Sequence, residues 1–199
     1  MGEMKLFTLM LWVCLFSYII GSIPFGYIFT KIFLKKDIRN IGSGNIGATN
    51  ALRTGNKFIG YSTLLFDILK AIIPVLIVKF HYAEFIYPSS LCVFIGHVFP
   101  IWLKFKGGKG VATYLGIIFC LNYLLGFTFI FIWVLIFLIS KYSSLSSLIA
   151  TLVIPIYYYF FIDNQNYYFY IIMFVLIFYT HRENIKRLIN NTESKTKIY

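Results

Sequence analysis

The chain has 199 residues, of which 59% are hydrophobic, 21% aromatic and only 13% charged, with a formal net charge of +11. Soluble domains carry about 25% charged residues, so this composition excludes an ordinary soluble protein. A helix needs about 20 apolar residues to cross the hydrocarbon layer of a membrane. Asp, Glu, Lys and Arg are absent from long stretches at 6–30, 85–103, 110–140, 142–162 and 164–181. The sequence therefore predicts an all-α integral membrane protein, with residues 1–199 as a single membrane-embedded domain.

In chain order, the apolar runs predict about seven transmembrane helices. The fourth and fifth are an ambiguous pair, because residues 110–140 would extend about 46 Å as one helix. That length is long for one span and short for two, and Asn122 is the only break. The expected spans are about 6–33, 59–79, 85–103, 111–121, 123–140, 143–161 and 167–180.

The distribution of basic residues favours two helices in that stretch. Lys and Arg prefer the cytoplasmic side of membrane proteins. With seven spans and the N-terminus outside, 15 of the 18 Lys and Arg residues fall on one face. That face is then cytoplasmic and includes the C-terminus. A single helix over 110–140 would move Lys141 and the C-terminal tail to the opposite face from the first two basic loops.

The first polar motif, residues 41–53, reads IGSGNIGATNALR and contains the spacing G-x-G-x-x-G. That spacing marks a dinucleotide site only when it follows a buried strand and opens a helix within a βαβ unit. The preceding residues, LKKDIRN, are charged rather than buried. Asp67, which lies at the right distance to contact a ribose, falls inside a predicted span. The sequence therefore excludes an NAD-binding fold.

The residue types of the first motif instead suit an anion. Glycines let the backbone approach a ligand closely, and asparagine offers both donors and acceptors. Successive N–H groups in such turns form anion-binding sites, and arginine offers a planar fork for phosphate or carboxylate. A flexible cytoplasmic loop is the alternative interpretation. The candidate residues are Gly42, Ser43, Gly44, Asn45 and Arg53.

The second motif, residues 96–113, reads GHVFPIWLKFKGGKGVAT and combines glycines with lysines. These residue types again indicate phosphate binding, whereas the alternative is contact of interfacial lysines with lipid headgroups. A Walker A loop is excluded because glycine, rather than Ser or Thr, follows the last lysine and no acidic Mg²⁺ ligand is near. The candidate residues are Lys104, Gly107, Gly108, Lys109 and Gly110.

The third motif, residues 181–195, directly follows the last apolar run. Its polar and apolar residues recur at helical spacing, so it is expected to begin as a helix. A basic tail in this place alternatively suits anionic lipid. A metal site at His181 and Glu183 is disfavoured because further ligands are lacking.

Charged and titratable residues also occur near or within the spans. Asp67 and Lys70 are three residues apart in the second span, so they are expected to form an ion pair that makes intramembrane charge tolerable. His81 and His97 are expected at the membrane interface, with His97 next to the second motif.

These motifs, in this order on a seven-span chain, closely resemble those of the bacterial acylphosphate:glycerol-3-phosphate acyltransferases, the PlsY family. The resemblance spans nearly the whole chain. It implies an enzyme that moves a fatty acyl group from acyl phosphate to glycerol 3-phosphate and forms lysophosphatidate in phospholipid synthesis. The segments that carry it are SYIIGSIPFGYI, KDIRNIGSGNIGATNALR, LLFDILK, GHVFPIWLKFKGGKGVAT and HRENIKRL.

The resemblance also implies roles for single residues. Ser43 and Arg53 match residues of the first motif that are needed for activity, and the second motif, from Lys104 to Gly110, is expected to hold glycerol 3-phosphate. In the third motif, His181 and Asn184 match residues that the family needs for activity.

The third motif also carries Glu193, which matches an acidic residue thought to be structural. The chain departs from the family pattern near it, because Asn191 stands where a glycine is usual. Asparagine tolerates the left-handed conformation better than most residues, so we expect this replacement to have little effect on the fold. Ala71 replaces another usual glycine, inside a helix where alanine is the better helix former.

The expected chemistry needs neither a metal nor a cofactor, because acyl phosphate is already activated. The site must orient a glycerol hydroxyl, neutralise phosphate charge and stabilise a developing oxyanion. His181 is either the base for the hydroxyl proton or only an orienting group, with a substrate phosphate oxygen taking the proton.

The expected location is the bacterial inner membrane, with the active site facing the cytoplasm. The expected partners are acyl phosphate, glycerol 3-phosphate and membrane lipid, and the enzyme that makes acyl phosphate is a candidate partner. No nucleic acid is expected to bind. The main alternative function is a transporter or channel for an anionic solute, but transporters usually bind substrate near the midplane between internal repeats. A non-catalytic scaffold would leave the polar motifs unexplained.

Overall fold

The computed structural model describes residues 2–162 and 165–196, which form helices and loops with no strand among them. The chain divides into two compact units, Met1–Cys120 and Leu121–Tyr199. The all-α prediction is confirmed. The first unit contains α1 (Gly2–Gly21), α2 (Phe25–Leu34), η1 (Ile38–Asn40), α3 (Ala48–Leu52), α4 (Lys57–His81), η2 (Ala83–Phe85), α5 (Ile86–Val98), η3 (Ile101–Leu103) and α6 (Val111–Leu121). The second contains α7 (Tyr123–Ser140), α8 (Ser143–Phe161), α9 (Tyr167–Thr180) and α10 (Arg182–Ile189).

Several helices of the described residues have the length and composition of membrane spans. Helix α4 has 25 residues, about 37 Å, but it carries Asp67 and Lys70 near its middle. Helices α6 and α9 have 11 and 14 residues, fewer than the roughly 20 that cross the hydrocarbon layer. The number of spans and their orientation stay predictions. Among residues 2–162 and 165–196, four segments are long and apolar enough to cross, namely Gly2–Leu34, Ala83–Leu103, Tyr123–Ser140 and Ser143–Phe161.

The predicted division of residues 110–140 into two helices is confirmed. Asn122 has an extended backbone, with φ −156° and ψ 118°. Its side chain accepts a hydrogen bond from the Leu124 N–H at 2.9 Å and so caps the start of α7. An asparagine at this position satisfies one of the backbone donors that a helix start leaves unpaired.

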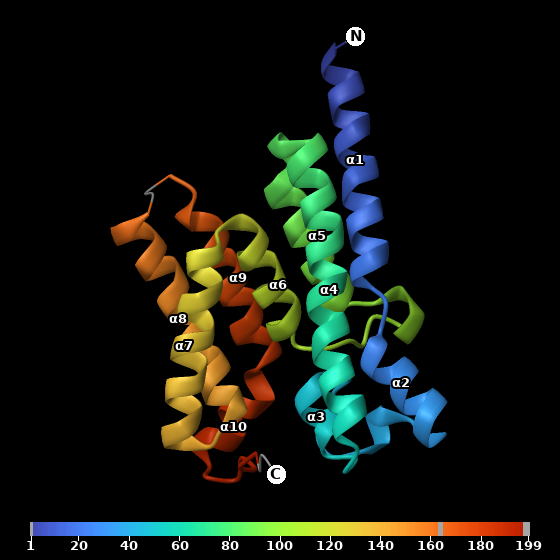
Figure 1. Ribbon diagram of the computed structural model, residues 1–199, viewed down its shortest axis with the longest axis vertical. Helices are drawn as coiled ribbons and strands as arrows, with labels where there is room; N and C mark the ends of the chain where they lie inside the picture. Colours follow the sequence, from blue (N-terminus) through green and yellow to red (C-terminus); the bar gives the residue numbers. More distant parts are fainter. Residues whose placement is uncertain (1, 163–164, 197–199) are drawn as a thin grey trace. The chain divides into compact units, whose positions relative to one another are not determined.

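The first expected span is not one continuous helix, because the chain turns between α1 and α2 (Figure 1). Pro24 precedes α2 and has no backbone N–H with which to continue α1. The break leaves the carbonyl of Ile23 to accept a hydrogen bond from Lys70 Nζ at 2.7 Å. Gly26 on α2 lies against the carbonyl of Ile46 in the first motif. The break therefore ties the start of α2 to both α4 and the first motif.

Small residues bring α1 and α5 close together, and both helices lie beside α4 (Figure 1). A Cβ added at Gly21 or at Gly96 would collide with the backbone of the facing helix. The hydroxyls of Ser17 and Ser89 are hydrogen-bonded across the two helices at 2.8 Å. Close backbone approach through small residues is typical of helix pairs in membranes. It fixes the end of α5, where the second motif begins.

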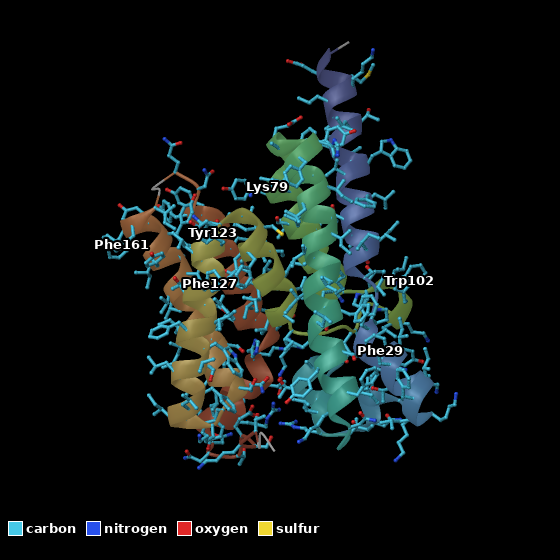
Figure 2. The ribbon with its side chains drawn as sticks, viewed as in Figure 1. Phe29, Lys79, Trp102, Tyr123, Phe127 and Phe161 are labelled. Atoms are coloured by element: carbon cyan, nitrogen blue, oxygen red, sulfur yellow. The ribbon has the colours of Figure 1, made fainter. Side chains whose placement is uncertain are left out.

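In the second unit, α7, α8 and α9 lie side by side (Figure 1). Tyr123 and Phe161 are exposed at one end of this unit (Figure 2), and aromatic residues are typical of membrane interfaces. At the other end, the N–H of Thr196 donates to the carbonyl of Lys141 at 2.9 Å. Within this unit, the α7–α8 turn and the third motif therefore lie at the same end, as a seven-span arrangement requires.

Candidate active site

The first motif is a loop that one buried side chain organises. Asn50 on α3 is 2% exposed, and its Oδ1 accepts a hydrogen bond from the Ser43 N–H at 2.9 Å. An amide has two N–H donors, so one of them is shared between two acceptors. Asn50 thus fixes the path of the loop on both sides of Ser43. Its Nδ2 donates to the carbonyls of Ile38, Ile41 and Asn45 at 3.2, 2.9 and 2.7 Å.

The residues expected to bind an anion lie on the exposed side of this loop. Gly42 and Gly44 have φ angles of 53° and 71°, which glycine adopts without steric cost. Ser43, between them, and Arg53 are both exposed. The aliphatic part of Arg53 packs on Gly42, where an added Cβ would lie 2.8 Å from Arg53 Cδ. The fold therefore brings the Arg53 side chain beside the turn that carries Ser43.

Asn45 makes a hydrogen bond within the loop itself. Its Oδ1 accepts a hydrogen bond from the Gly47 N–H at 2.9 Å, which closes a turn within the loop. The organising asparagine is instead Asn50, which sequence reasoning missed. Both residues belong to the same motif, and only the three-dimensional path of the loop distinguishes them.

The structure brings the second motif against the first. Leu103 in η3 is buried in one hydrophobic cluster with residues of the first motif and its flanks. Lys104 and Phe105 follow with φ angles of 53° and 60°, and both are exposed. Trp102 is also exposed (Figure 2). The cluster partners of Leu103 are Ile38, Ile46, Ala51 and Ile59.

The glycines of the second motif serve packing as much as backbone freedom. The N–H of Gly107 donates to the Val98 carbonyl at 3.0 Å, and the N–H of Gly108 donates to the His97 carbonyl at 3.1 Å. An added Cβ at either glycine would collide with the end of α5. These two amides therefore hold the loop on α5 and are already engaged as hydrogen-bond donors. The lysines of the motif are the other donors suited to a phosphate, and Lys104 is exposed.

Beneath this loop lies a buried polar cluster. Lys70 Nζ is 2.8 Å from Asp67 Oδ1, so the expected ion pair is confirmed, and both side chains are almost fully buried. His97 Nδ1 is 3.7 Å from the same Asp67 oxygen. Packing of α5 on α1 and α4 leaves His97 3% exposed, so it is buried within the protein, and its place at the membrane interface stays a prediction. His81, in contrast, is exposed.

In the second unit, the histidine of the third motif has a defined tautomer. His181 is 2% exposed, and its Nδ1 lies 2.8 Å from the carbonyl oxygen of Ile177. A carbonyl only accepts hydrogen bonds, so Nδ1 carries the proton and Nε2 of the neutral ring carries the lone pair. Nε2 is therefore the nitrogen that suits the role of acceptor or base.

The other predicted residue of the third motif is held by a carboxylate. Asn184 Nδ2 donates to Glu193 Oε1 at 2.6 Å, and Arg187 Nε donates to Glu193 Oε2 at 2.6 Å. Ser144, at the start of α8, also donates to Oε1 at 2.8 Å. Burial raises the pKa of the Glu193 carboxyl, but these hydrogen bonds outweigh burial and hold the pKa below its ordinary value of 4.5. Glu193 therefore links α8 and α10 as a charged acceptor.

The turn before Glu193 shows why Asn191 suffices where a glycine was expected. Asn191 has a φ of 54°, and its N–H donates to the Leu188 carbonyl at 3.2 Å. The N–H of Thr192 donates to the Arg187 carbonyl at 2.8 Å. These two bonds are the Schellman ending of a helix, which needs a left-handed residue at this point. The expectation that asparagine adopts this conformation is confirmed.

The predicted site residues thus fall into two groups. The structure brings the first and second motifs together in the first unit, whereas His181 and Asn184 belong to the second unit. Among residues 2–162 and 165–196, no group of three or more His, Cys, Asp or Glu side chains could hold a metal ion. Ser144 was not predicted, because it is one of four serines in the run SSLSS and no sequence signal distinguishes it from the others.

Comparison with known proteins decides the family. A family model described as glycerol-3-phosphate acyltransferase matches residues 11–191. The chain belongs to this family. A glycerol-3-phosphate acyltransferase of Pelagibacter ubique (strain HTCC1062) is 69% identical over 187 residues, which cover 94% of this chain and 97% of that protein. One from Brucella anthropi is 45% identical over 180 residues, 90% of each chain.

The likeness of this chain to a solved structure supports its place in the glycerol-3-phosphate acyltransferase family. The crystal structure of PlsY (YgiH), an integral membrane glycerol 3-phosphate acyltransferase in its glycerol 3-phosphate form, has a TM-score of 0.88 and 35% identity. It covers 94% of this chain and 96% of that one. The lysophosphatidic acid form of that protein has a TM-score of 0.86. This acyltransferase is therefore a multi-pass integral membrane protein, and the family match includes the first two motifs and residues 181–191 of the third.

Proposed function

We propose that this protein transfers a fatty acyl group from acyl phosphate to glycerol 3-phosphate and so forms lysophosphatidate. In this reaction an oxygen of the glycerol hydroxyl bonds to the acyl carbonyl carbon. The bond from that carbon to the phosphate oxygen breaks, and phosphate leaves with the hydroxyl proton. The observation that carries the proposal is the likeness to a solved acyltransferase in its glycerol 3-phosphate and lysophosphatidic acid forms, over 94% of the chain.

The first unit supplies the phosphate-binding groups in this proposal. The turn Gly42–Gly44 presents Ser43, and Arg53 lies beside that turn and offers a planar guanidinium. Asn45 shapes the same turn. In the second motif, Lys104 and Lys109 neutralise the phosphate of glycerol 3-phosphate, and Gly107, Gly108 and Gly110 place them.

The third motif supplies the group that handles the hydroxyl. We assign His181 Nε2 as the acceptor of the O–H of the glycerol hydroxyl that does not react, because Nδ1 is engaged as a donor. In this assignment His181 orients the glycerol, while an oxygen of the acyl phosphate takes the proton of the reacting hydroxyl. Asn184, held by Glu193, offers its amide to the same substrates.

The proposed location follows the distribution of basic residues. We propose that the protein lies in the bacterial inner membrane with the three motifs on the cytoplasmic side, since 15 of the 18 Lys and Arg residues fall on that face in the seven-span arrangement. Acyl phosphate is a lipid-like and reactive donor, so the enzyme that makes it is a proposed partner. Labelling of single cysteines at 109 and 181 in intact cells tests the orientation, and reaction with a periplasmic reagent would contradict it.

The decisive experiment compares acyl donors with purified protein. Acyl phosphate, acyl-CoA and acyl carrier protein are each supplied with glycerol 3-phosphate, and lysophosphatidate is measured. We expect lysophosphatidate to form only when acyl phosphate is the donor. Turnover with another donor would contradict the proposed donor. Absence of any turnover, together with uptake of glycerol 3-phosphate into vesicles, would favour the transporter.

The role of His181 is tested by two substitutions. Glutamine retains a hydrogen-bonding group, so His181→Gln is expected to keep measurable activity, whereas His181→Ala is expected to lose nearly all of it. The rate is measured against pH for each variant. If the Gln variant is as inactive as the Ala variant, His181 is the base and not an orienting group.

A further inference from the structure

We propose that His97 is a positioning residue for the binding of glycerol 3-phosphate, because its imidazole is the surface on which Gly108 rests. The proposal rests on the proposed function, which assigns glycerol 3-phosphate to the second motif. His97 belongs to that motif by sequence, but its buried ring faces away from any solvent.

The contact between His97 and the loop is a direct one. A Cβ added at Gly108 would collide with Nε2, Cε1 and Cδ2 of the His97 ring. Gly108 is itself buried. Its lack of a side chain is therefore required by the imidazole beneath it, since its φ is not among the positive values that favour glycine.

Backbone hydrogen bonds hold the loop in this position. The amides of Gly107 and Gly108 donate to carbonyls of the last two residues of α5, Val98 and His97. The loop thus lies flat on the end of α5. Lys104 precedes this contact and Lys109 follows it, so a displaced loop displaces both proposed phosphate-binding lysines together.

The ring lies beside a buried ion pair of α4. His97 Nδ1 lies 3.7 Å from Asp67 Oδ1, and Asp67 is paired with Lys70 at 2.8 Å. Lys70 also donates to the Ile23 carbonyl at the α1–α2 break. Separating a buried ion pair is costly, so Asp67 and Lys70 hold α4 and the break in one arrangement, with His97 of α5 packed beside them. The position of the imidazole follows from that arrangement.

The contact between His97 and the loop is expected to affect the binding of glycerol 3-phosphate more than the binding of acyl phosphate. A shifted loop weakens the grip on the phosphate of glycerol 3-phosphate, whereas acyl phosphate is expected to rely on the first and third motifs. Loss of positioning therefore raises the KM or Kd for glycerol 3-phosphate while leaving kcat and the KM for acyl phosphate little changed. A role in stability alone would lower the melting temperature without this selectivity.

The test is a double-mutant cycle between positions 97 and 108. Gly108→Ala forces the loop away from the ring. His97→Asn keeps a polar atom near the Nδ1 position but lacks the Nε2 and Cε1 atoms that the new methyl group would meet. We expect Gly108→Ala to raise the Kd for glycerol 3-phosphate, and His97→Asn to reverse that increase in the double variant by about tenfold, within the range for contacting residues.

Gly107→Ala is the matched control. Its Cβ would collide with the backbone carbonyls of His97 and Val98 and with the ring of Pro100, none of which His97→Asn removes. The proposal is supported if His97→Asn reverses the increase in Kd caused by Gly108→Ala but not the increase caused by Gly107→Ala. Independent, additive effects of His97→Asn and Gly108→Ala, or a lower melting temperature with an unchanged Kd, would overturn it.

The binding measurement keeps this proposal separate from the proposed function. Calorimetric titration of purified protein with glycerol 3-phosphate reports Kd without any acyl donor. Protein that binds glycerol 3-phosphate and shows the reversal by His97→Asn, but does not turn over acyl phosphate, would confirm the positioning and contradict the proposed reaction. Wild-type protein that does not bind glycerol 3-phosphate would overturn both.

Discussion

Two loops of this protein are each organised by one buried side chain, and the two side chains act in opposite ways. In the first motif, the neutral Asn50 donates hydrogen bonds to three backbone carbonyls. In the second unit, the charged Glu193 accepts hydrogen bonds from three side chains. A carboxylate in the position of Asn50 would repel a phosphate at the neighbouring turn. A neutral organiser therefore suits a loop that binds anions, whereas Arg187 compensates the charge of Glu193.

The largest expected effect comes from giving the first loop a charged organiser. Asn50→Asp preserves shape but removes the donors to the Ile38, Ile41 and Asn45 carbonyls. Each buried carbonyl without a donor costs about 1–3 kcal/mol, so we expect at least about a hundredfold loss of activity, which corresponds to about 2.7 kcal/mol. The measurement is kcat/KM for glycerol 3-phosphate together with the melting temperature in detergent.

Asn45→Asp is the control for the melting temperature of that variant. The Oδ1 of Asn45 only accepts a hydrogen bond, from Gly47, and a carboxylate retains that bond. Equal melting temperatures for the two variants would show that Asn50 does not organise the loop.

A smaller effect is expected from removing the charge of the second organiser. Glu193→Gln keeps one acceptor oxygen but turns an amide N–H₂ toward donors. Loss of hydrogen bonds to a charged group costs about 1.5–3 kcal/mol each, and the partial exposure of Arg187 moderates the loss. We expect a lower melting temperature and a moderate fall in kcat, because Asn184 loses its fixed position.

Glu183→Gln, on α10, is the matched control. Glu183 is 59% exposed, and its nearest ion-pair distance is 3.5 Å, to Lys186. Exposed pairs of this kind contribute about 0–1 kcal/mol. If this variant melts as far below the wild type as Glu193→Gln does, the buried carboxylate has no special role.

The two organisers are also expected to differ in their response to pH. The pKa of Glu193 in the folded protein lies below its ordinary value of 4.5. Its contribution to stability is therefore fully present above about pH 4.5 and is lost as the pH falls through the folded-state pKa. The difference in melting temperature between wild type and Glu193→Gln should narrow below that pH. A difference that stays constant into the acid range would contradict the ionised state of Glu193.

The smallest effects are expected at the turn before Glu193. Asn191 already adopts the left-handed conformation, so Asn191→Gly should leave the melting temperature unchanged or slightly raised. Asn191→Ala should cost about 1 kcal/mol, because Cβ sterics disfavour that conformation. The corresponding change in the first loop, Gly42→Ala, is expected to be more damaging, since its Cβ would also meet Asn50 and Arg53. Equal losses for the two alanine variants would contradict this ranking.

The sequence by itself determined the features that depend on neighbours along the chain. Apolar runs placed the helices, Asn122 marked the only break in 110–140, and the spacing of Asp67 and Lys70 brought them together on one face of α4. The residue types of the three motifs indicated phosphate chemistry and the family. All these signals arise within a few residues of one another, where helix periodicity and local hydrogen bonding act.

Only the tertiary structure decided which polar residues organise the motifs. Asn50 and Asn45 are equivalent by composition, and the path of the loop gives one of them four hydrogen-bond partners. Glu193 meets Ser144 across 49 residues of sequence, and His97 is buried because α5 packs on α1 and α4. The physical reason is the same in each case, since burial and hydrogen bonding between distant segments depend on how helices pack and not on the local sequence.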